Sequence, residues 1–481
     1  MLRKLAAVMF YASVPLWLAF FYSFISPDDG WIPIGLTLLI MGLPAVPQIL
    51  RGMLENTKTA LRSLVHKDTP FNYAKVLDTE SMRKEVETLT FGEVLALTAL
   101  AWILVPFLSV FPYIYYGVPV LDAFFESVSG WTSTGLSALP TVAIIPKSVI
   151  FFRSITQWVG GLGIVVLILS TTKGREAISF LRAEGRSQTE LGIAQTVSTT
   201  FNVYFVLTIL GIILCLIVGF DPFNAVNLTF AAIANGGFFP FDSYPLTDIQ
   251  KLALAAILFA GATSVLFFRS VWQGMIAKAF SDEELVLYAG LTALAVILML
   301  TVGGEGGFNA LLNGVAAITG GGFGIGDLTI MHTFGIYVLI ILMLSGGMTG
   351  STTGAIKLWR VLVIMKAVWK QVKESFMPAG SVQVVKINYL PINERMIVES
   401  AIFVFAYLLV FLAASGAFMT AAYGTEDSMF LVATAMGNVG LSTVSIPAVG
   451  AAGKSLLIFL MYIGRIEIFP SLALVAFITR R

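Results

Sequence analysis

The sequence predicts an all-α integral membrane protein of ten spanning helices. Four parallel repeats of helix, re-entrant pore helix and helix surround one pore, and an N-terminal helix pair precedes them. Composition supports this prediction first, because 57% of the 481 residues are hydrophobic and 12% are charged, whereas a soluble domain has about 25% charged residues. Ten apolar runs support it second, and a short pattern that occurs four times between the later runs supports it third.

The ten apolar runs are long enough to span a bilayer, which takes about 20 residues. The first run starts with positive charge but is too long for a signal peptide, so we expect it to remain as a spanning helix. The first two runs and the cytosolic loop after them occupy residues 1–90, and the other eight form repeats at 91–197, 198–282, 283–395 and 396–481. The runs lie at about residues 5–25, 32–50, 91–115, 148–171, 200–220, 250–268, 284–302, 333–369, 396–423 and 454–478.

The fourfold pattern consists of an Asp or Asn, about ten mostly apolar residues and a glycine hairpin, with thirteen positions from the Asx residue to the last glycine. Asp and Asn are preferred helix N-caps, and a helix of about ten residues is too short to cross the membrane. We therefore expect four capped half-length helices that enter the membrane and return. The predicted caps are Asp122, Asn224, Asn309 and Asp427, and the last glycines are Gly135, Gly237, Gly322 and Gly440.

Lysine and arginine predict the orientation, since they concentrate in cytoplasmic loops. Assigning alternate loops to one side places 24 of the 29 basic residues there, against Lys147, Arg153, Lys251 and Lys454 on the other side. The basic side includes both ends of the chain. We therefore predict cytoplasmic termini and four hairpins that face outward.

The four hairpins are made of small and polar residues and contain no carboxylate. Small residues let backbone carbonyls turn toward a common axis and replace the hydration shell of an ion, and half-helix C-termini add partial negative charge for a cation. Glycine hairpins could instead only let helices pack closely, but four at matched spacing favour an ion filter. The predicted filter residues are Thr132, Ser133, Thr134, Gly135, Ala234, Asn235, Gly236, Gly237, Thr319, Gly320, Gly321, Gly322, Gly437, Asn438, Val439 and Gly440.

The eighth run is interrupted by Leu344–Lys357, which is too rich in glycine, serine and threonine for a stable helix. We expect two half-helices joined by an irregular segment at membrane depth. This segment is either a mobile plug below the filter or a kink, and its many glycines favour the plug because a kink needs only one or two. The residues assigned to this gating loop are Gly346, Gly347, Gly350, Ser351, Thr352, Thr353, Gly354 and Lys357.

Arg465 lies inside the last apolar run, where a charge is costly and usually faces a cavity or a partner. Glu467 is two positions away, so the two side chains cannot share one helix face. We therefore predict that Arg465 points into the pore beneath the filter and discourages tight cation occupancy. The alternative is an arginine that snorkels or caps backbone carbonyls.

Together these motifs resemble the Trk/Ktr/HKT superfamily of K⁺ transporters, and within it the TrkH-like membrane subunits. The matching segments extend from about residue 91 to the end of the chain: DAFFESVSGWTSTG, QWVGGLGIVVL, ANGGF, TGGGF, LSGGMTGSTTGAIK, GNVG and GRIEIFP. The resemblance implies K⁺ uptake across the cytoplasmic membrane of a prokaryote. It implies that K⁺ is both transported and bound in the filter, that the interrupted run is a gating loop, and that Arg465 is the pore arginine.

The resemblance also bears on selectivity and on partners. In plant-type relatives a serine at the first filter glycine is linked to Na⁺ permeation, so Gly135 indicates K⁺ selectivity, although Asn235 and Gly320–Gly321 stand where relatives usually carry threonine. The family implies a homodimer and a cytosolic nucleotide-binding regulatory ring (TrkA-like), with nucleotide bound by the ring and not by this chain. The basic segments 172–197 and 357–395 would offer a docking surface, but cytoplasmic charge bias explains them equally well.

Two other classes of function compete with this interpretation. A secondary transporter coupled to H⁺ or Na⁺ would also break its helices at the binding site, but it usually has inverted halves and an ionisable residue at the midplane. An intramembrane aspartyl protease is suggested by the GIGD string ending at Asp327, but its chemistry needs two carboxylates that share a proton, and the sequence offers no second Asp within a span. We therefore expect a transport protein and no enzyme.

Overall fold

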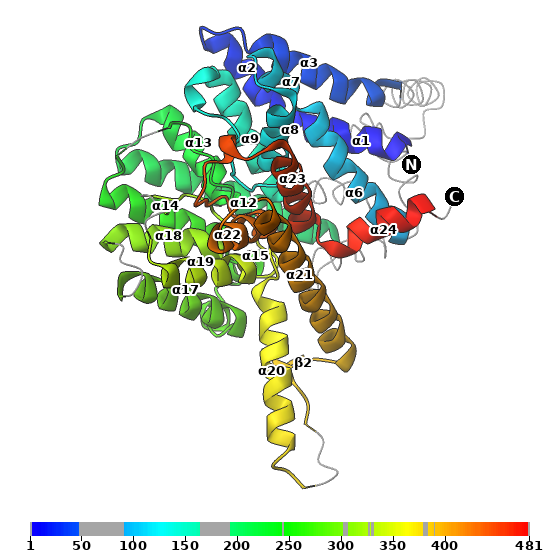
Figure 1. Cartoon of the computed structure of the whole chain (residues 1–481), viewed down its shortest axis with the longest axis vertical. Coiled ribbons are helices and arrows are strands. Elements are labelled where there is room, and N and C mark those ends of the chain that lie inside the picture. The colour runs from blue at the N-terminus through cyan, green and yellow to red at the C-terminus, as the bar shows by residue number, and fades with distance from the viewer. Residues whose placement is uncertain are drawn as a thin grey trace, which may run out of the picture.

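The computed structural model describes residues 2–47, 91–163, 193–242, 245–301, 306–325, 328, 331–378, 383–388 and 390–479. Almost all of its regular structure is helical, and the described residues contain a single small antiparallel sheet of β1 (Lys386–Ile387) and β2 (Leu390–Pro391). Five of the described helices are long and apolar enough to cross a membrane, and a bent helix pair is a sixth candidate. The protein is thus a mostly helical, multi-pass membrane protein (Figure 1).

The N-terminal helices form a side unit beside the rest of the molecule (Figure 1). A 3₁₀ turn with a proline in its first turn joins the first two helices, so the first predicted span is jointed. The unit shares a buried core with α6, α7 and the fourth predicted span, and α24 at the end of the chain packs against α6. Its elements are α1 (Leu2–Ser13), η1 (Val14–Leu16), α2 (Trp17–Ile25), α3 (Trp31–Gly42) and η2 (Leu43–Ala45), and the helices beside it are α6 (Phe91–Leu108) and α7 (Phe111–Tyr115).

Four short helices lie at the centre of the fold. They contain 12 or 13 residues each, which is too short to span a bilayer. Most of their side chains are buried, because each pore helix packs between the helix that precedes it in its repeat and the helix that follows it. These pore helices are α8 (Val120–Trp131), α13 (Pro222–Ile233), α18 (Gly307–Thr319) and α22 (Thr425–Gly437).

The prediction that the four Asx residues cap the pore helices is wrong. Each of Asp122, Asn224, Asn309 and Asp427 stands at the third position inside its helix, and the N-caps are Pro119, Asp221, Gly306 and Gly424. A preferred cap residue can also stand in the first turn, where it meets the positive end of the helix dipole or another partner. Asp122 pairs with Lys454, and Asp427 accepts a hydrogen bond from the Thr443 hydroxyl at 2.6 Å. The common third position still shows that the four helices are in equivalent register.

The flanking helices close the four repeats into a ring. In every repeat the pore helix contacts both flanking helices, and the second flanking helix also contacts the pore helix of the next repeat: α9 contacts α13, α14 contacts α18, α19 contacts α22, and α23 contacts α8. The flanking helices are α6 and α9 (Lys147–Leu162), α12 (Ile193–Ile217) and α14 (Asp248–Gly261), α17 (Glu283–Thr301) and α19 (Thr333–Ser345), and α21 (Glu394–Thr420) and α23 (Ala451–Ile466).

Within the described residues, the sixth, eighth and tenth predicted spans are each broken into two helices, although a break was predicted for the eighth alone. The eighth is interrupted as predicted, between α19 and α20 (Leu358–Glu374). The sixth, predicted as one helix over 250–268, bends by 92° between α14 and α15 (Val265–Trp272), where Ser264 caps the new helix. The tenth, predicted over 454–478, breaks at Glu467, whose φ of 66° separates α23 from α24 (Ile468–Thr479). The end predicted for the fourth span at residue 171 lies outside the described residues.

Two helices, α16 (Ile276–Phe280) and α20, follow the breaks in the sixth and eighth predicted spans. α16 follows α15, and α20 projects well beyond the body of the molecule beside the first turns of α21 (Figure 1). The β1–β2 hairpin lies between these two helices in the sequence, and its Ile387 packs with Leu362 and Val363 of α20 in a small separate core. In the described part of the chain, α20 and the first turns of α21 therefore form an elongated extension on one side of the pore helices (Figure 1).

Candidate functional site

The last glycines of the four hairpins form a closed ring. Gly135, Gly237, Gly322 and Gly440 have φ angles of 88°, 76°, 46° and 101°, which favour glycine because the left-handed region is disfavoured for L side chains. A Cβ on Gly135 would lie 1.8 Å from the Gly236 oxygen, and one on Gly237 would lie 2.5 Å from the Gly322 Cα. A Cβ on Gly322 would meet the Val439 oxygen at 2.3 Å and one on Gly440 the Thr134 oxygen at 2.3 Å. Each hairpin thus contacts the next, and the fourth contacts the first.

The residue two positions before each of these glycines also has a positive φ angle. Ser133, Asn235, Gly320 and Asn438 have φ angles of 54°, 52°, 72° and 53°. Asparagine and glycine visit this region routinely, whereas serine does so at some cost in energy. The Ser133 hydroxyl donates a hydrogen bond to the Gln157 carbonyl at 3.0 Å, which helps to hold that residue in place. All four hairpins therefore reverse direction by the same backbone conformation.

The sixteen residues predicted for the filter are brought together by this arrangement. The helices α8 and α13 end one residue before the first filter residue of their hairpins, and α18 and α22 end at it, so four helix C-termini converge on the ring. Helix C-termini carry partial negative charge. The Thr134, Gly236, Gly321 and Val439 carbonyl oxygens each lie against the glycine of the adjacent hairpin. The ring therefore offers backbone oxygen and partial negative charge with no ionised side chain among its members.

The interrupted eighth span passes next to two of the hairpins. The Asn235 side-chain amide donates a hydrogen bond to the Thr352 hydroxyl at 2.7 Å, and a Cβ on Gly354 would lie 2.5 Å from the Asn438 side-chain oxygen. On its other side, the Thr349 amide donates to the buried Glu284 carboxylate at 2.6 Å. The predicted gating loop is thus an ordered segment packed against the second and fourth hairpins.

Arg465 connects this loop to the end of α9. Its guanidinium donates hydrogen bonds to the carbonyl oxygens of Thr352, Gly160 and Gly161, the last at 3.1 Å. Its guanidinium carbon also lies 5.6 Å from the centre of the Trp102 ring. The contacts are those of a carbonyl-binding arginine, which was the alternative interpretation of the sequence. The barrier role of Arg465 stays a prediction.

Comparison with known proteins shows which family this architecture represents. The TrkH family, described as cation transport proteins, matches residues 78–240 and 244–479. The chain belongs to the TrkH family. It is therefore a cation transport protein and not an enzyme. It is 31% identical over 401 residues to an uncharacterized cation transporter of Methanocaldococcus jannaschii, with 81% of this chain and 83% of the relative covered.

Other relatives and one solved structure agree with this assignment. The chain is 28% identical over 420 residues to the Trk system potassium uptake protein TrkH of Escherichia coli, with 82% of this chain and 86% of the relative covered. It is 26% identical to the protein of the same name from Halomonas elongata, covering 92% and 96%. The crystal structure of the potassium transporter TrkH from Vibrio parahaemolyticus has the same fold, with a TM-score of 0.80, 22% identity and coverage of 99% and 98%.

Glu467 is a residue of this TrkH-family site that the sequence interpretation missed. It directly follows the last residue of α23, it is buried, and its carboxylate pairs with Arg360 at 2.7 Å and with Lys357 at 3.5 Å. The Arg360 guanidinium carbon also lies 3.9 Å from the centre of the Phe403 ring. The sequence signal is the intramembrane Arg-x-Glu string, in which Glu467 was considered only as a partner of Arg465 and not as a partner of more distant basic residues. Glu467 ties the break in the tenth span to the start of α20.

Replacing Glu467 by glutamine is expected to destabilise the folded protein, because its nearly buried ion pairs with Arg360 and Lys357 would be lost. Removing one partner of a buried ion pair costs about 3 kcal/mol. The measurement is the midpoint of thermal unfolding in detergent. Glu399→Gln is the matched control, because its pair with Arg395 at 2.7 Å has side chains that are 57% and 85% exposed and contributes little. Equal midpoints for the two variants would contradict the prediction.

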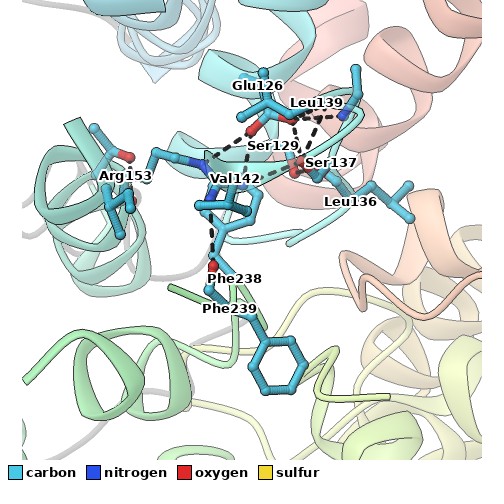
Figure 2. Close-up of polar contacts among 12 residues, drawn as sticks. Glu126, Ser129, Leu136, Ser137, Leu139, Val142, Arg153, Phe238 and Phe239 are labelled. Atoms are coloured by element: carbon cyan, nitrogen blue, oxygen red, sulfur yellow. Dashed lines mark hydrogen bonds and ion pairs between the residues drawn. The ribbon is translucent and has the colours of Figure 1, made fainter. Parts of the chain in front are cut away.

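Glu126 and Arg153 form a second buried group that the sequence interpretation passed over (Figure 2). Arg153 was counted only as a basic residue of the outer side, and Glu126 was not considered because it lies in a pore helix and not in a hairpin. The signal was available, since a carboxylate within an apolar half-helix needs a partner. Asp327, on which the protease alternative depends, lies outside the described residues.

Proposed function

We propose that this TrkH-family protein takes up K⁺ across the cytoplasmic membrane through a gated, channel-like pore. The observation that carries this proposal is the closed ring of Gly135, Gly237, Gly322 and Gly440, in which every hairpin repeats the same backbone turn. Relatives named as potassium uptake proteins support K⁺ as the ion. The division into a helix pair and four repeats at 91–197, 198–282, 283–395 and 396–481 belongs to the same proposal.

Selection in this pore depends on backbone oxygens. Carbonyls of the four hairpins replace the hydration shell of K⁺, and the converging helix C-termini add partial negative charge. Uptake needs no second ion, because a membrane potential of 100 mV, negative inside, contributes about 2.3 kcal/mol per charge. That value corresponds to accumulation of about fiftyfold.

The gate and the barrier lie on the cytoplasmic side of the ring. The segment Gly346–Lys357 closes the passage beneath the second and fourth hairpins, and Arg465 places positive charge beside it. The orientation comes from the excess of Lys and Arg in the loops assigned to one side. Both termini are then cytoplasmic, and the hairpins open outward.

Regulation involves other chains in this proposal. The protein forms a homodimer in which each protomer keeps its own pore, and a cytosolic nucleotide-binding ring docks on the inner face. The elongated extension of α20 and the first turns of α21 (Figure 1) is where this regulatory ring docks. The helix α20 contributes basic residues there, including Lys370 and Lys373. Nucleotide is bound by the cytosolic regulatory ring and not by this chain.

Ion flux into liposomes tests the function and the filter together. The purified protein should admit K⁺ down its gradient faster than Na⁺ under otherwise identical conditions, without a counter-gradient of H⁺ or Na⁺. Gly135→Ser should lower K⁺ flux and remove the preference for K⁺, because the new side chain collides with the Gly236 oxygen. A variant that conducts with an unchanged K⁺/Na⁺ preference would show that Gly135 is not in the filter.

A further inference from the structure

Glu126 lies in the pore helix α8 and holds the residues that follow Gly135 in the first hairpin. We call such a contact, from a pore helix to the chain beyond its ring glycine, a brace. One oxygen of the fully buried Glu126 carboxylate accepts hydrogen bonds from the Ser137 hydroxyl at 2.6 Å and from the Ala138 and Leu139 amides at 2.6 and 3.3 Å (Figure 2). These residues follow Gly135 by two to four positions. The carboxylate therefore holds the chain immediately beyond the ring glycine.

Arg153 extends this brace to the second hairpin. Its Nε and Nη2 atoms donate to the other Glu126 oxygen at 3.2 and 3.0 Å. Its guanidinium carbon lies 3.9 Å from the centre of the Phe238 ring, and its Nη1 donates to the Phe239 carbonyl at 3.5 Å (Figure 2). Phe238 and Phe239 directly follow Gly237. One buried ion pair thus touches the chain just beyond two adjacent ring glycines.

The third repeat carries a neutral version of the same brace. Asn313 is the seventh residue of α18, as Glu126 is the seventh residue of α8. The buried Asn313 side chain donates to the Ile325 carbonyl and accepts from the Ile325 amide, both at 2.9 Å. Ile325 lies twelve positions after Asn313, as Ala138 lies twelve positions after Glu126. Two unrelated side chains therefore do the same task at equivalent positions.

The second and fourth repeats have leucine at this position. Leu228 is the seventh residue of α13 and Leu431 the seventh of α22, and both are fully buried. A leucine side chain makes no hydrogen bond to its hairpin. Since each hairpin contacts the next in chain order, the first and third lie diagonally opposite across the ring. The brace from the seventh residue of the pore helix therefore occurs along one diagonal, and other contacts hold the remaining two hairpins: Arg153 to the Phe239 carbonyl, and the Thr443 hydroxyl to Asp427.

We propose that Glu126 and Asn313 are positioning residues that hold the first and third hairpins apart, and that this diagonal brace sets the discrimination between K⁺ and smaller cations. The inference rests on the proposed function, because it needs the ring to be the ion filter. K⁺ requires its oxygens further from the ion than Na⁺ does. Hairpins released from the brace relax inward and accommodate Na⁺ better.

The test is the K⁺/Na⁺ flux ratio in liposomes for three variants. Asn313→Leu gives the third repeat the side chain of the second and fourth. Ser137→Ala removes one donor to Glu126 with little risk to folding. Glu126→Leu combined with Arg153→Met removes the whole ion pair without leaving a buried charge, which proteins often tolerate. We expect each to conduct K⁺ and to lower the ratio, by about five- to tenfold for the larger changes, as when one or two ordinary hydrogen bonds are lost.

Lys454→Gln is the matched control. Lys454 pairs with Asp122 of the same pore helix at 2.6 Å, with side chains that are 8% and 20% exposed, but it reaches no hairpin in that contact. Its variant should keep the wild-type ratio. Wild-type ratios in Ser137→Ala and in a folded Asn313→Leu would overturn the inference and leave the proposed function intact. A wild-type protein that does not prefer K⁺ would overturn both.

Discussion

Replacing Gly440 by alanine is expected to abolish K⁺ transport. The residue has a φ of 101°, and a Cβ there would lie 2.3 Å from the Thr134 oxygen, so the side chain would push a ring carbonyl out of place. A non-glycine residue in such a conformation costs about 1–3 kcal/mol even in open space. The collision adds to this strain, and we expect K⁺ flux in liposomes to fall about a hundredfold or more, which corresponds to about 2.7 kcal/mol.

Gly219→Ala is the control for backbone strain alone. Gly219 has a φ of 90°, and nothing lies within 4 Å of the position of its added Cβ. The two variants should therefore lose similar amounts of stability from backbone strain, whereas only Gly440→Ala alters the ring. Comparable flux in the two variants, with both folded, would show that the glycine ring does not determine conduction.

Replacing Arg465 by glutamine is expected to raise K⁺ flux. The change removes a positive charge beside the proposed passage, and it weakens the bridge from the Thr352 carbonyl to Gly160 and Gly161 that holds the gating loop. An increase of about tenfold would correspond to lowering the barrier by about 1.4 kcal/mol. The measurement is initial K⁺ flux in liposomes at matched protein content. Arg395→Gln, which removes an exposed inner charge, should leave the flux unchanged.

Arg465→Lys separates the charge from the bridge. Lysine keeps the positive charge, but its compact ammonium cannot present the planar fork that spans carbonyls of two segments. Flux that stays low in this variant would assign the barrier to the charge. Flux that rises as in Arg465→Gln would assign it to the bridge and to loop movement. Low flux in both variants, with intact folding, would contradict the barrier prediction and show a structural arginine.

The repeated hairpins were predictable because their signal is local. A short apolar helix followed by glycine can be recognised within about fifteen residues, and four copies at equal spacing exclude coincidence. The break in the eighth span was predictable for the same reason, since helix propensity sums over neighbours. Gly135, Gly237, Gly322 and Gly440 were identified in this way.

Other features could not be predicted because their causes lie far away in the sequence. Asp122 fits an N-cap by residue type, yet its partner is Lys454, more than three hundred residues later. The break at Glu467 follows from its pairing with Lys357 and Arg360, although the surrounding residues are apolar enough to continue a helix. A hydropathy profile reports only the average apolar character of a segment and gives no information about contacts with distant residues.

The residue pattern alone was sufficient for the membrane class, the four equivalent hairpins and their glycines, because apolar length and glycine placement act through local backbone energetics. The closure of the ring, the diagonal brace of Glu126 and Asn313 and the carbonyl contacts of Arg465 depended on the folded chain. They depend on which distant groups meet in a buried, low-dielectric environment, where every polar group must find a partner.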